Sequence, residues 1–286
     1  MGNVLLKISE IREQFTDREI KISQYIEKNL EEVKLLNTYE LGKKCGVSQA
    51  SIVRFSKKLG FSGFPEFKIA LSSDIGKQEV ENNINIIHEE IKADDSTEDT
   101  SKKVAYENIK TIEDTLKLLD FEALDEAVKE LDRARKIFIL GGGFSGIAAR
   151  DFYYKLLEIG KMAIFESDSH IQFSNFSTIE KDDVVFVISL SGKSLDIYNL
   201  LKEPKRRGVK IITLTKFSPN PVSDLGDVKL AIASEKNNFR STALSSRIAQ
   251  LTVIDMIYVK LIQRNKTLAE KYIGNALEMV KDMKIK

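Results

Sequence analysis

The stretch Val184–Ser194, VVFVISLSGKS, gives the clearest indication of how the longer half of the chain folds. Its first five residues are all β-branched or aromatic, which predicts a strand buried on both faces. The apolar run stops at Ser189, and the sequence Ser-Leu-Ser-Gly-Lys-Ser follows. That ending is similar to the second half of a phosphate-binding P-loop. It could bind a nucleotide, bind another anion, or form only a polar turn.

Four other short apolar runs rich in Ile and Val surround this strand in the sequence. They are KIFIL (136–140), MAIF (162–165), VKIITLT (209–215) and VKLAIA (228–233). Segments of helical length separate most of them, which predicts an α/β fold with a parallel sheet and helices on both faces. A helix from about Thr242 to Ile262 and an amphipathic tail close the chain. Ligands of such sheets bind at the carboxyl ends of the strands.

The loop after Val184–Ile188 lacks an essential part of a P-loop. The motif G-x-x-x-x-G-K-[ST] needs an earlier glycine, and Val187 occupies that position inside the strand. Three hydroxyls and one glycine remain at the start of a helix, where hydroxyls and free amides favour one compact anion. These residues are Ser189, Ser191, Gly192 and Ser194. The alternative is that the serines are only caps and turn residues, with Lys193 pointing to solvent.

The loop after the first strand, ILGGGFSGIAARDF, contains G-x-G-x-x-G at Gly141, Gly143 and Gly146. Glu166 follows the next strand, where a dinucleotide fold places its ribose-binding acid. A dinucleotide site is therefore one interpretation. The other interpretation uses Ser145 of this loop together with the serines of the second loop, because hydroxyls from two strand ends suit a phosphate carried on a polyol.

The first 75 residues have a helical period. Thr16–Glu19 matches a capping box, Gly46 can end a helix and Ser48 can begin the next. Two short helices joined by a tight turn that contains glycine predict a helix-turn-helix. Gly76 is expected to end the helical pattern, and an acid-rich connector should become helical again near Ser101.

Residues 41–65 contain five basic residues and no Asp or Glu, so a local DNA-binding patch is expected although the whole chain has a net charge of only +1. The early residues of a recognition helix contact base edges. The candidates for base contacts are Gln49, Ala50, Ser51 and Arg54. The candidates for phosphate contacts are Lys43, Lys44, Ser48, Lys57 and Lys58. The alternative is an ordinary solvated helix face.

The chain has 286 residues, of which 42% are hydrophobic and 30% charged. Cys45 is the one cysteine, so no internal disulfide can form, and it is expected to lie in the core. Cys45, His88 and His170 make no zinc spacing, and neither a metal nor a cofactor is expected. We expect a cytoplasmic protein, because the sequence contains neither a signal peptide nor an apolar run of membrane-spanning length.

Two of these patterns resemble one known family over nearly the whole chain. GGGFSG and SLSGKS, on this order of strands, resemble the SIS (sugar isomerase) phosphosugar-binding domain. GVSQASIVRFSKKLGFSGFPEFKIAL resembles the helix-turn-helix of RpiR/MurR-type transcriptional regulators. The resemblance implies that Ser145, Ser189, Ser191 and Ser194 contact a phosphosugar, and it implies dimers or tetramers with ligand sites near subunit contacts. Lys193 departs from sugar-phosphate enzymes of this fold, where an acidic residue is common.

We therefore predict a helix-turn-helix domain (1–77), a linker with a connecting helix (78–120), a SIS domain (121–265) and a C-terminal helix (266–286). The expected protein is a transcriptional regulator, not an enzyme, that binds operator DNA and is modulated by a phosphorylated sugar. The predicted sugar-site residues are Gly143, Ser145, Ser189, Ser191, Gly192 and Ser194. Three alternatives remain: a dinucleotide-sensing repressor, a DNA-binding structural protein whose sheet domain only oligomerises, and a sugar-phosphate isomerase. The possible bases of an isomerase are Glu166, Asp168, His170 and Glu235.

Overall fold

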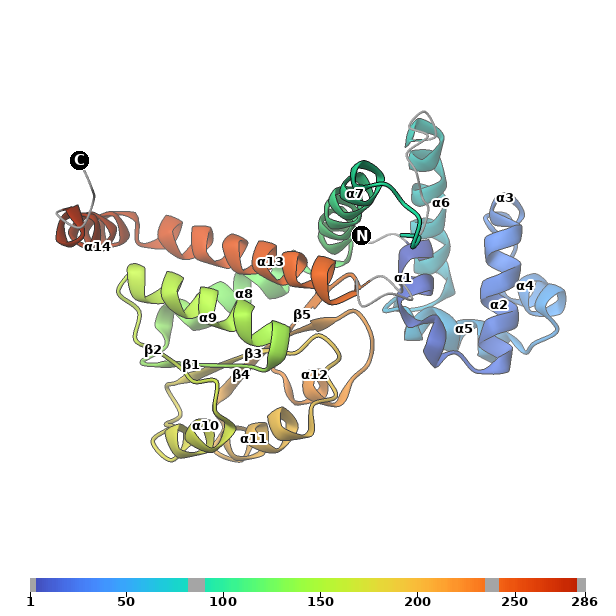
Figure 1. Cartoon of the computed structure of the whole chain (residues 1–286). Helices are drawn as coiled ribbons and strands as arrows, with labels where there is room; N and C mark the ends of the chain where they lie inside the picture. The colour runs from blue at the N-terminus through green and yellow to red at the C-terminus, as the bar shows by residue number, and fades with distance from the viewer. Residues whose placement is uncertain (1–3, 82–90, 235–241, 282–286) are drawn as a thin grey trace. The chain divides into compact units, whose positions relative to one another are not determined.

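The computed structural model describes residues 4–81, 91–234 and 242–281, and the chain divides into two compact units, 1–105 and 106–286 (Figure 1). Within those described ranges, none of the helices is long and apolar enough to cross a membrane. The first unit begins with a run of short helices. Its elements are α1 (Val4–Ile11), a 3-10 turn (Arg12–Gln14), α2 (Asp17–Lys28), α3 (Leu30–Val33), α4 (Thr38–Cys45), α5 (Gln49–Lys58) and α6 (Phe64–Glu81).

A cluster of aromatic rings forms the centre of the helical unit. Phe55 of α5 is buried between Phe15 and Phe67, with ring centroids 5.3 and 6.3 Å away. Phe61 and Phe64 pack on Phe67 in turn, at 5.6 and 5.8 Å. Aromatic pairs at these separations add about 0.5–1.5 kcal/mol each beyond the area they bury. The cluster therefore fixes the inner face of α5 and leaves its opposite face exposed.

Two expectations about helix boundaries are wrong. Gly76 lies inside α6, which continues to Glu81; one glycine costs a helix only about 1 kcal/mol, too little to end it. The next helix, α7 (Thr97–Leu118), begins before Ser101, because Ser96 caps it: the Asp99 amide donates to Ser96 Oγ at 3.1 Å. His88 and part of the predicted linker lie outside the described residues.

The second unit holds the predicted α/β fold, and its five strands confirm the five apolar runs. They form one parallel sheet in the order β2-β1-β3-β4-β5. The strands are β1 (Ile137–Gly141), β2 (Ala163–Phe165), β3 (Val184–Ile188), β4 (Lys210–Lys216) and β5 (Val228–Ile232). The helices are α8 (Phe121–Arg133), α9 (Gly143–Glu158), α10 (Ser169–Phe176), α11 (Leu195–Arg206), α12 (Pro221–Leu225), α13 (Thr242–Arg264) and α14 (Lys266–Met279).

Helices cover both faces of the sheet, with α8, α9 and α13 on one face and α10, α11 and α12 on the other (Figure 1). Alternate residues of β1 serve the two cores. Ile137 and Ile139 belong to the first core, and Phe138 and Leu140 belong to the second. Strands that are buried on both sides need apolar residues at every position, which is why the runs are continuous rather than alternating.

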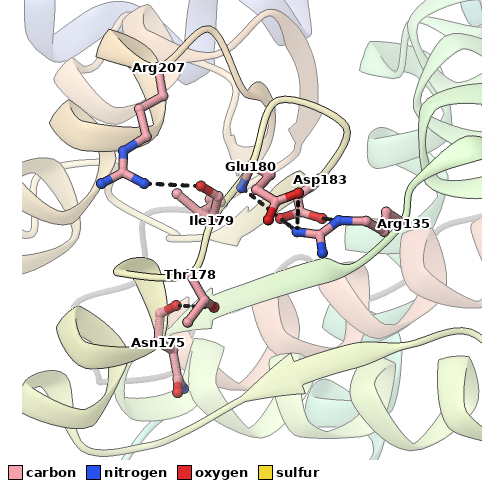
Figure 2. Close-up of polar contacts among 7 residues, drawn as sticks. All are labelled: Arg135, Asn175, Thr178, Ile179, Glu180, Asp183 and Arg207. Atoms are coloured by element: carbon pink, nitrogen blue, oxygen red, sulfur yellow. Dashed lines mark hydrogen bonds and ion pairs between the residues drawn. The ribbon is translucent and has the colours of Figure 1, made fainter.

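A cluster of polar contacts ties the amino ends of β1 and β3 together (Figure 2). Arg135 precedes β1, and its guanidinium donates to both carboxylate oxygens of the buried Asp183, at 3.0 and 2.8 Å. Glu180 lies 3.3 Å from the same guanidinium, and its backbone amide donates to Asp183 at 2.8 Å. Arg207 at the end of α11 donates to the carbonyl of Ile179 at 3.0 Å. These contacts lie at the edge of the sheet opposite to the carboxyl ends of the strands.

The two partners of the Arg135–Asp183 pair should differ in their effect on stability. Arg135→Ala leaves a buried carboxylate without its cation, and we expect a loss of about 3 kcal/mol in the free energy of unfolding. Asp183→Ala leaves a guanidinium that still reaches solvent and Glu180, so a smaller loss of about 1–2 kcal/mol is expected. Scanning calorimetry of both variants measures the difference. Equal losses, or a larger loss for Asp183→Ala, would contradict this explanation.

Candidate functional site

A cavity of about 490 Å³ opens at the carboxyl ends of β1 and β3, which are neighbours in the sheet. Its volume is in the ~300–1,000 Å³ range of small-molecule sites. The structure brings five of the six predicted sugar-site residues to its wall. These are Gly143, Ser145, Ser189, Ser191 and Ser194. The amino-terminal ends of two helices, α9 and α11, meet at this cavity, and their free amides favour an anion there.

The four serines differ in how far their hydroxyls are already engaged. Ser145 is buried in the first turn of α9, and its Oγ accepts a hydrogen bond of 3.1 Å from Gln250 Nε2. Ser191 Oγ accepts from the Lys193 amide at 3.2 Å, as a turn residue does. Ser194 occupies the N-cap position of α11, yet its side chain makes no cap bond. Ser189 is buried. Turn and cap roles therefore account for Ser191 but leave the hydroxyl of Ser194 without such a role.

Gly192, the sixth predicted residue, shapes the loop and does not line the cavity. Its φ of 63° is in the left-handed region, and a Cβ there would lie 1.8 Å from Asn220 Oδ1. Asn220 is buried and held in place, because its Nδ2 donates to the Ser218 carbonyl at 2.8 Å and its Oδ1 accepts from the Ser223 amide at 2.8 Å. The Val222 amide donates to the Gly192 carbonyl at 3.1 Å. The serine loop is thus attached to the loop that follows β4.

Sequence reasoning missed three polar residues of the cavity wall that lie on α13. They are Ser246, Arg247 and Gln250. Their spacing along the chain matches two adjacent turns of one helix, but the sequence around them contains no motif. Arg247 is the one ionisable side chain among the described residues that line the cavity. The described wall contains no Asp, Glu or His, so it supplies hydroxyls, an amide and a cation but no general base.

The dinucleotide interpretation loses support from the geometry of the glycine loop. Gly141 is needed for packing, because a Cβ would lie 2.8 Å from the Ser145 carbonyl oxygen and 2.9 Å from Ala149 Cβ. Glu166 is exposed and is not among the described residues of the cavity wall. The strand order 2-1-3-4-5 also differs from the 3-2-1-4-5-6 order of the dinucleotide-binding fold.

The other carboxylate and histidine candidates have ordinary positions or are not described. Asp168 caps α10, as its Oδ1 accepts from the amides of His170 and Ile171 at 2.8 and 3.1 Å. His170 itself is exposed. Glu235 lies outside the described residues.

The helix-turn-helix forms as the sequence predicts. Gly46 ends α4 with a φ of 66°, and Ser48 caps α5 by accepting from the Ser51 amide at 3.3 Å. Gly42 was not anticipated: a Cβ there would lie 2.9 Å from the Val47 carbonyl oxygen, so the close turn requires glycine. Cys45 is buried, and burial raises the pKa of its thiol to about 11, which keeps it protonated.

Most of the predicted DNA-contacting residues lie on the outside of α4 and α5. The exposed ones are Lys43, Lys44, Ser48, Gln49, Ala50, Arg54 and Lys57. Ser51 is buried, and its Oγ lies 2.9 Å from Ser48 Oγ. Its hydroxyl therefore faces the turn instead of the outer surface, since it follows the cap by one helical turn.

Two of the predicted phosphate-contacting lysines are paired within the domain. Lys44 lies 2.8 Å from Glu32, and Lys58 donates to Glu19 at 2.8 Å and to the Gln14 carbonyl at 2.6 Å. Burial alone would raise the pKa of Glu19, but hydrogen bonds from Lys58 and from Thr16 lower it on balance. Lys58 thus joins the recognition helix to the start of α2, which differs from its expected role on phosphate.

Comparison with known proteins agrees with this architecture and defines its class. Residues 2–78 match the helix-turn-helix domain of the rpiR family, and residues 130–260 match the SIS domain. These two domains, in this order, define a transcriptional regulator that binds DNA through its amino-terminal domain.

Full-length relatives place the chain in one family of such regulators. It is 34% identical over 285 residues to an uncharacterised HTH-type transcriptional regulator of Caldanaerobacter subterraneus, covering 100% of this chain and 99% of the relative. It is 32% identical over 260 residues to another of Clostridium perfringens, covering 91% and 92%. The chain belongs to the RpiR family of HTH-type transcriptional regulators with a C-terminal SIS domain.

Solved structures show the same fold at lower identity. The Vibrio vulnificus NanR protein complexed with ManNAc-6P is 23% identical with a TM-score of 0.62, and the match covers 99% of this chain and 100% of that one. The sugar isomerase domain of an RpiR transcription factor from Sphaerobacter thermophilus is 20% identical with a TM-score of 0.55, covering 61% of this chain and 96% of the other. A phosphoheptose isomerase from Francisella tularensis is 20% identical with a TM-score of 0.51, covering 59% and 100%.

Gly192→Ala tests the attachment of the serine loop to Asn220. The left-handed backbone and the contact with Asn220 should together cost about 2–4 kcal/mol of stability. Gly208→Ala is the matched control: its φ is 70°, but a Cβ there meets nothing within 4 Å, so only the backbone cost of about 1–2 kcal/mol is expected. Calorimetry of both variants separates the cost of the left-handed backbone from the cost of the contact with Asn220. If both lose the same stability, the contact with Asn220 does not constrain the loop.

Proposed function

We propose that this regulator binds a phosphorylated sugar in the cavity at the ends of β1 and β3 and that the bound sugar changes its affinity for operator DNA. The observation that carries the proposal is the chemistry of the wall: serine hydroxyls from two strand ends, two helix amino termini and Arg247. These groups favour a compact dianion and leave further hydroxyls for a polyol. The V. vulnificus protein complexed with ManNAc-6P shares the fold, which makes that sugar phosphate a suitable probe.

The same wall supports a sensor over an isomerase. Sugar-phosphate isomerisation needs a positioned base, and the described lining residues include none with a carboxylate or an imidazole. We therefore infer a non-enzymatic role.

A regulator bound to the chromosome works in the cytoplasm. We propose a homodimer or homotetramer, since paired DNA-binding domains match paired operator half-sites.

In the DNA-binding domain, we propose that the exposed residues of α5 read bases and that the exposed lysines contact phosphates. Gln49, Ala50 and Arg54 lie on the outer face of the early part of the helix. Gln pairs with adenine, Arg with guanine, and the Ala methyl contacts thymine. Ser48, Lys43, Lys44 and Lys57 would position the domain on the backbone. The inward side chain of Ser51 and the paired Lys58 support structural roles for those two residues.

Fluorescence anisotropy with labelled DNA from the region flanking the gene tests the coupling. A sugar phosphate that stabilises the protein should change the DNA dissociation constant by about 5–150-fold, and the same sugar without phosphate should not. Ser191→Ala should reduce this effect while leaving DNA binding without sugar intact. A sugar phosphate that binds tightly but never alters DNA affinity would refute the coupling.

Substitutions in α5 should separate base reading from phosphate contact. Arg54→Ala should lose about 1–3 kcal/mol of discrimination at one base position, whereas Lys57→Ala should weaken all DNA sequences alike and reduce the salt dependence. Lys58→Ala is the control for a structural role. It removes the bond to Glu19 and should therefore lower the melting temperature of the domain. The measurement is anisotropy against a set of single-base operator variants. A uniform loss for Arg54→Ala would contradict its assignment to a base.

A further inference from the structure

Two buried hydroxyls near the start of α13 have no hydrogen-bond partner in the described structure. Ser245 and Ser246 are each 1% exposed, and neither Oγ is bonded to any protein group. A buried polar group without a partner costs about 1–3 kcal/mol. Of the two, Ser246 lines the cavity described above and Ser245 is not among its lining residues. A ligand in the cavity can therefore supply a partner to Ser246 and not to Ser245.

The position of Ser246 relative to the serine loops follows from the helix. Ser246 lies one turn before Gln250, so both face the same side, about 6 Å apart along the helix axis. Gln250 Nε2 is 3.1 Å from Ser145 Oγ in the first turn of α9. Ser246 is thus placed about one helical turn along α13 from the residue that bonds Ser145. That spacing is suited to the body of a sugar whose phosphate lies at the helix ends.

The start of α11 offers the phosphate a separate place in the wall. Ser189 and Ser194 surround the start of α11, where free amides and the helix dipole favour an anion. Ser246 is the fifth residue of α13, so its own amide is already bonded within the helix and it offers the cavity one neutral hydroxyl. A neutral hydroxyl is matched by a hydroxyl or acylamino group, which both donate and accept.

We propose that Ser246 is a specificity-determining residue that binds a hydroxyl or acylamino group of the sugar, apart from the phosphate contacts. This inference rests on the proposed function, since it requires a phosphosugar in the cavity. A contact of this kind restricts the ligand to sugar phosphates that carry a hydroxyl or acylamino group within hydrogen-bonding distance of Ser246. Inorganic phosphate would not engage Ser246.

Titration calorimetry of Ser246→Ala and Ser245→Ala tests the assignment. The probes are ManNAc-6P, glucose 6-phosphate and ribose 5-phosphate, with inorganic phosphate as a competitor that lacks the sugar. Ser246→Ala should weaken the tightest sugar phosphate by about tenfold, as expected when one hydrogen bond to a buried site is lost, and should change the affinity for inorganic phosphate by less than about twofold. Ser245→Ala, the matched buried hydroxyl outside the cavity, should change neither.

Melting temperatures without ligand show whether a loss of binding reflects misfolding. Both alanine variants remove an unpartnered buried hydroxyl, so both should melt at or above the temperature of the unmodified protein. Ser246→Cys nearly keeps the size of the side chain, but a thiol forms only weak hydrogen bonds. The Cys variant should therefore bind the sugar phosphate as poorly as the Ala variant does. This variant separates a lost hydrogen bond from a change in cavity shape.

Each remaining outcome overturns a definite claim. If the unmodified protein binds a sugar phosphate and Ser246→Ala binds it equally well, the role of Ser246 is refuted while the proposed function stands. An equal loss for inorganic phosphate would make Ser246 a phosphate contact and refute its assignment to the sugar. If the unmodified protein binds none of the three sugar phosphates, the proposed function fails and the inference fails with it.

Discussion

The parallel pairing of β1 with β3, which sets Gly141 beside Ile188, is the constraint on which the ligand site depends. The strand order reverses at this pair, so the loops that leave the two strands diverge to opposite faces and leave a crevice between them. Helices α9 and α11 start from these loops and point their amino termini at the same space. At the opposite edge, the Arg135–Asp183 pair holds the two strands in this adjacency. The cavity follows from the topology before any particular side chain is considered.

The side chains then determine which chemistry the crevice supports. Its described wall supplies hydroxyls, an amide and one guanidinium, and no carboxylate or imidazole. Such a wall suits the binding of a phosphorylated polyol but supplies no base to move protons on it. The regulatory proposal follows from this composition together with the family of the chain, in which a SIS domain is joined to a DNA-binding domain. A ligand that binds without turnover can act as a signal through its differential affinity for two arrangements of the protein.

Much of this architecture could be predicted from the sequence, because it depends on local patterns. The five apolar runs, the cap at Ser48 and the turn at Gly46 each follow from a few neighbouring residues. Ser145 and Ser189 could be placed at one site because parallel strands end at a common edge. The serines of this edge were predicted as ligand contacts, and that assignment remains a proposal.

The parts that the sequence did not reveal depend on contacts between distant residues. Ser246 and Gln250 reach the cavity only because α13 packs across α9, and no local motif announces this. Lys58 pairs with Glu19, which lies 39 positions earlier in the chain. Because this partner could not be seen from the neighbouring sequence, Lys58 was predicted to contact phosphate.

A thermal-shift panel on the purified protein tests whether the crevice is a phosphosugar site. The panel compares hexose and pentose phosphates, the same sugars without phosphate, NAD, NADH and ATP. A ligand that prefers the folded state raises the melting temperature by mass action. We predict stabilisation by a sugar phosphate and none by its unphosphorylated form. Stabilisation by NAD or NADH alone would contradict this prediction and would assign the site to the glycine loop and Glu166.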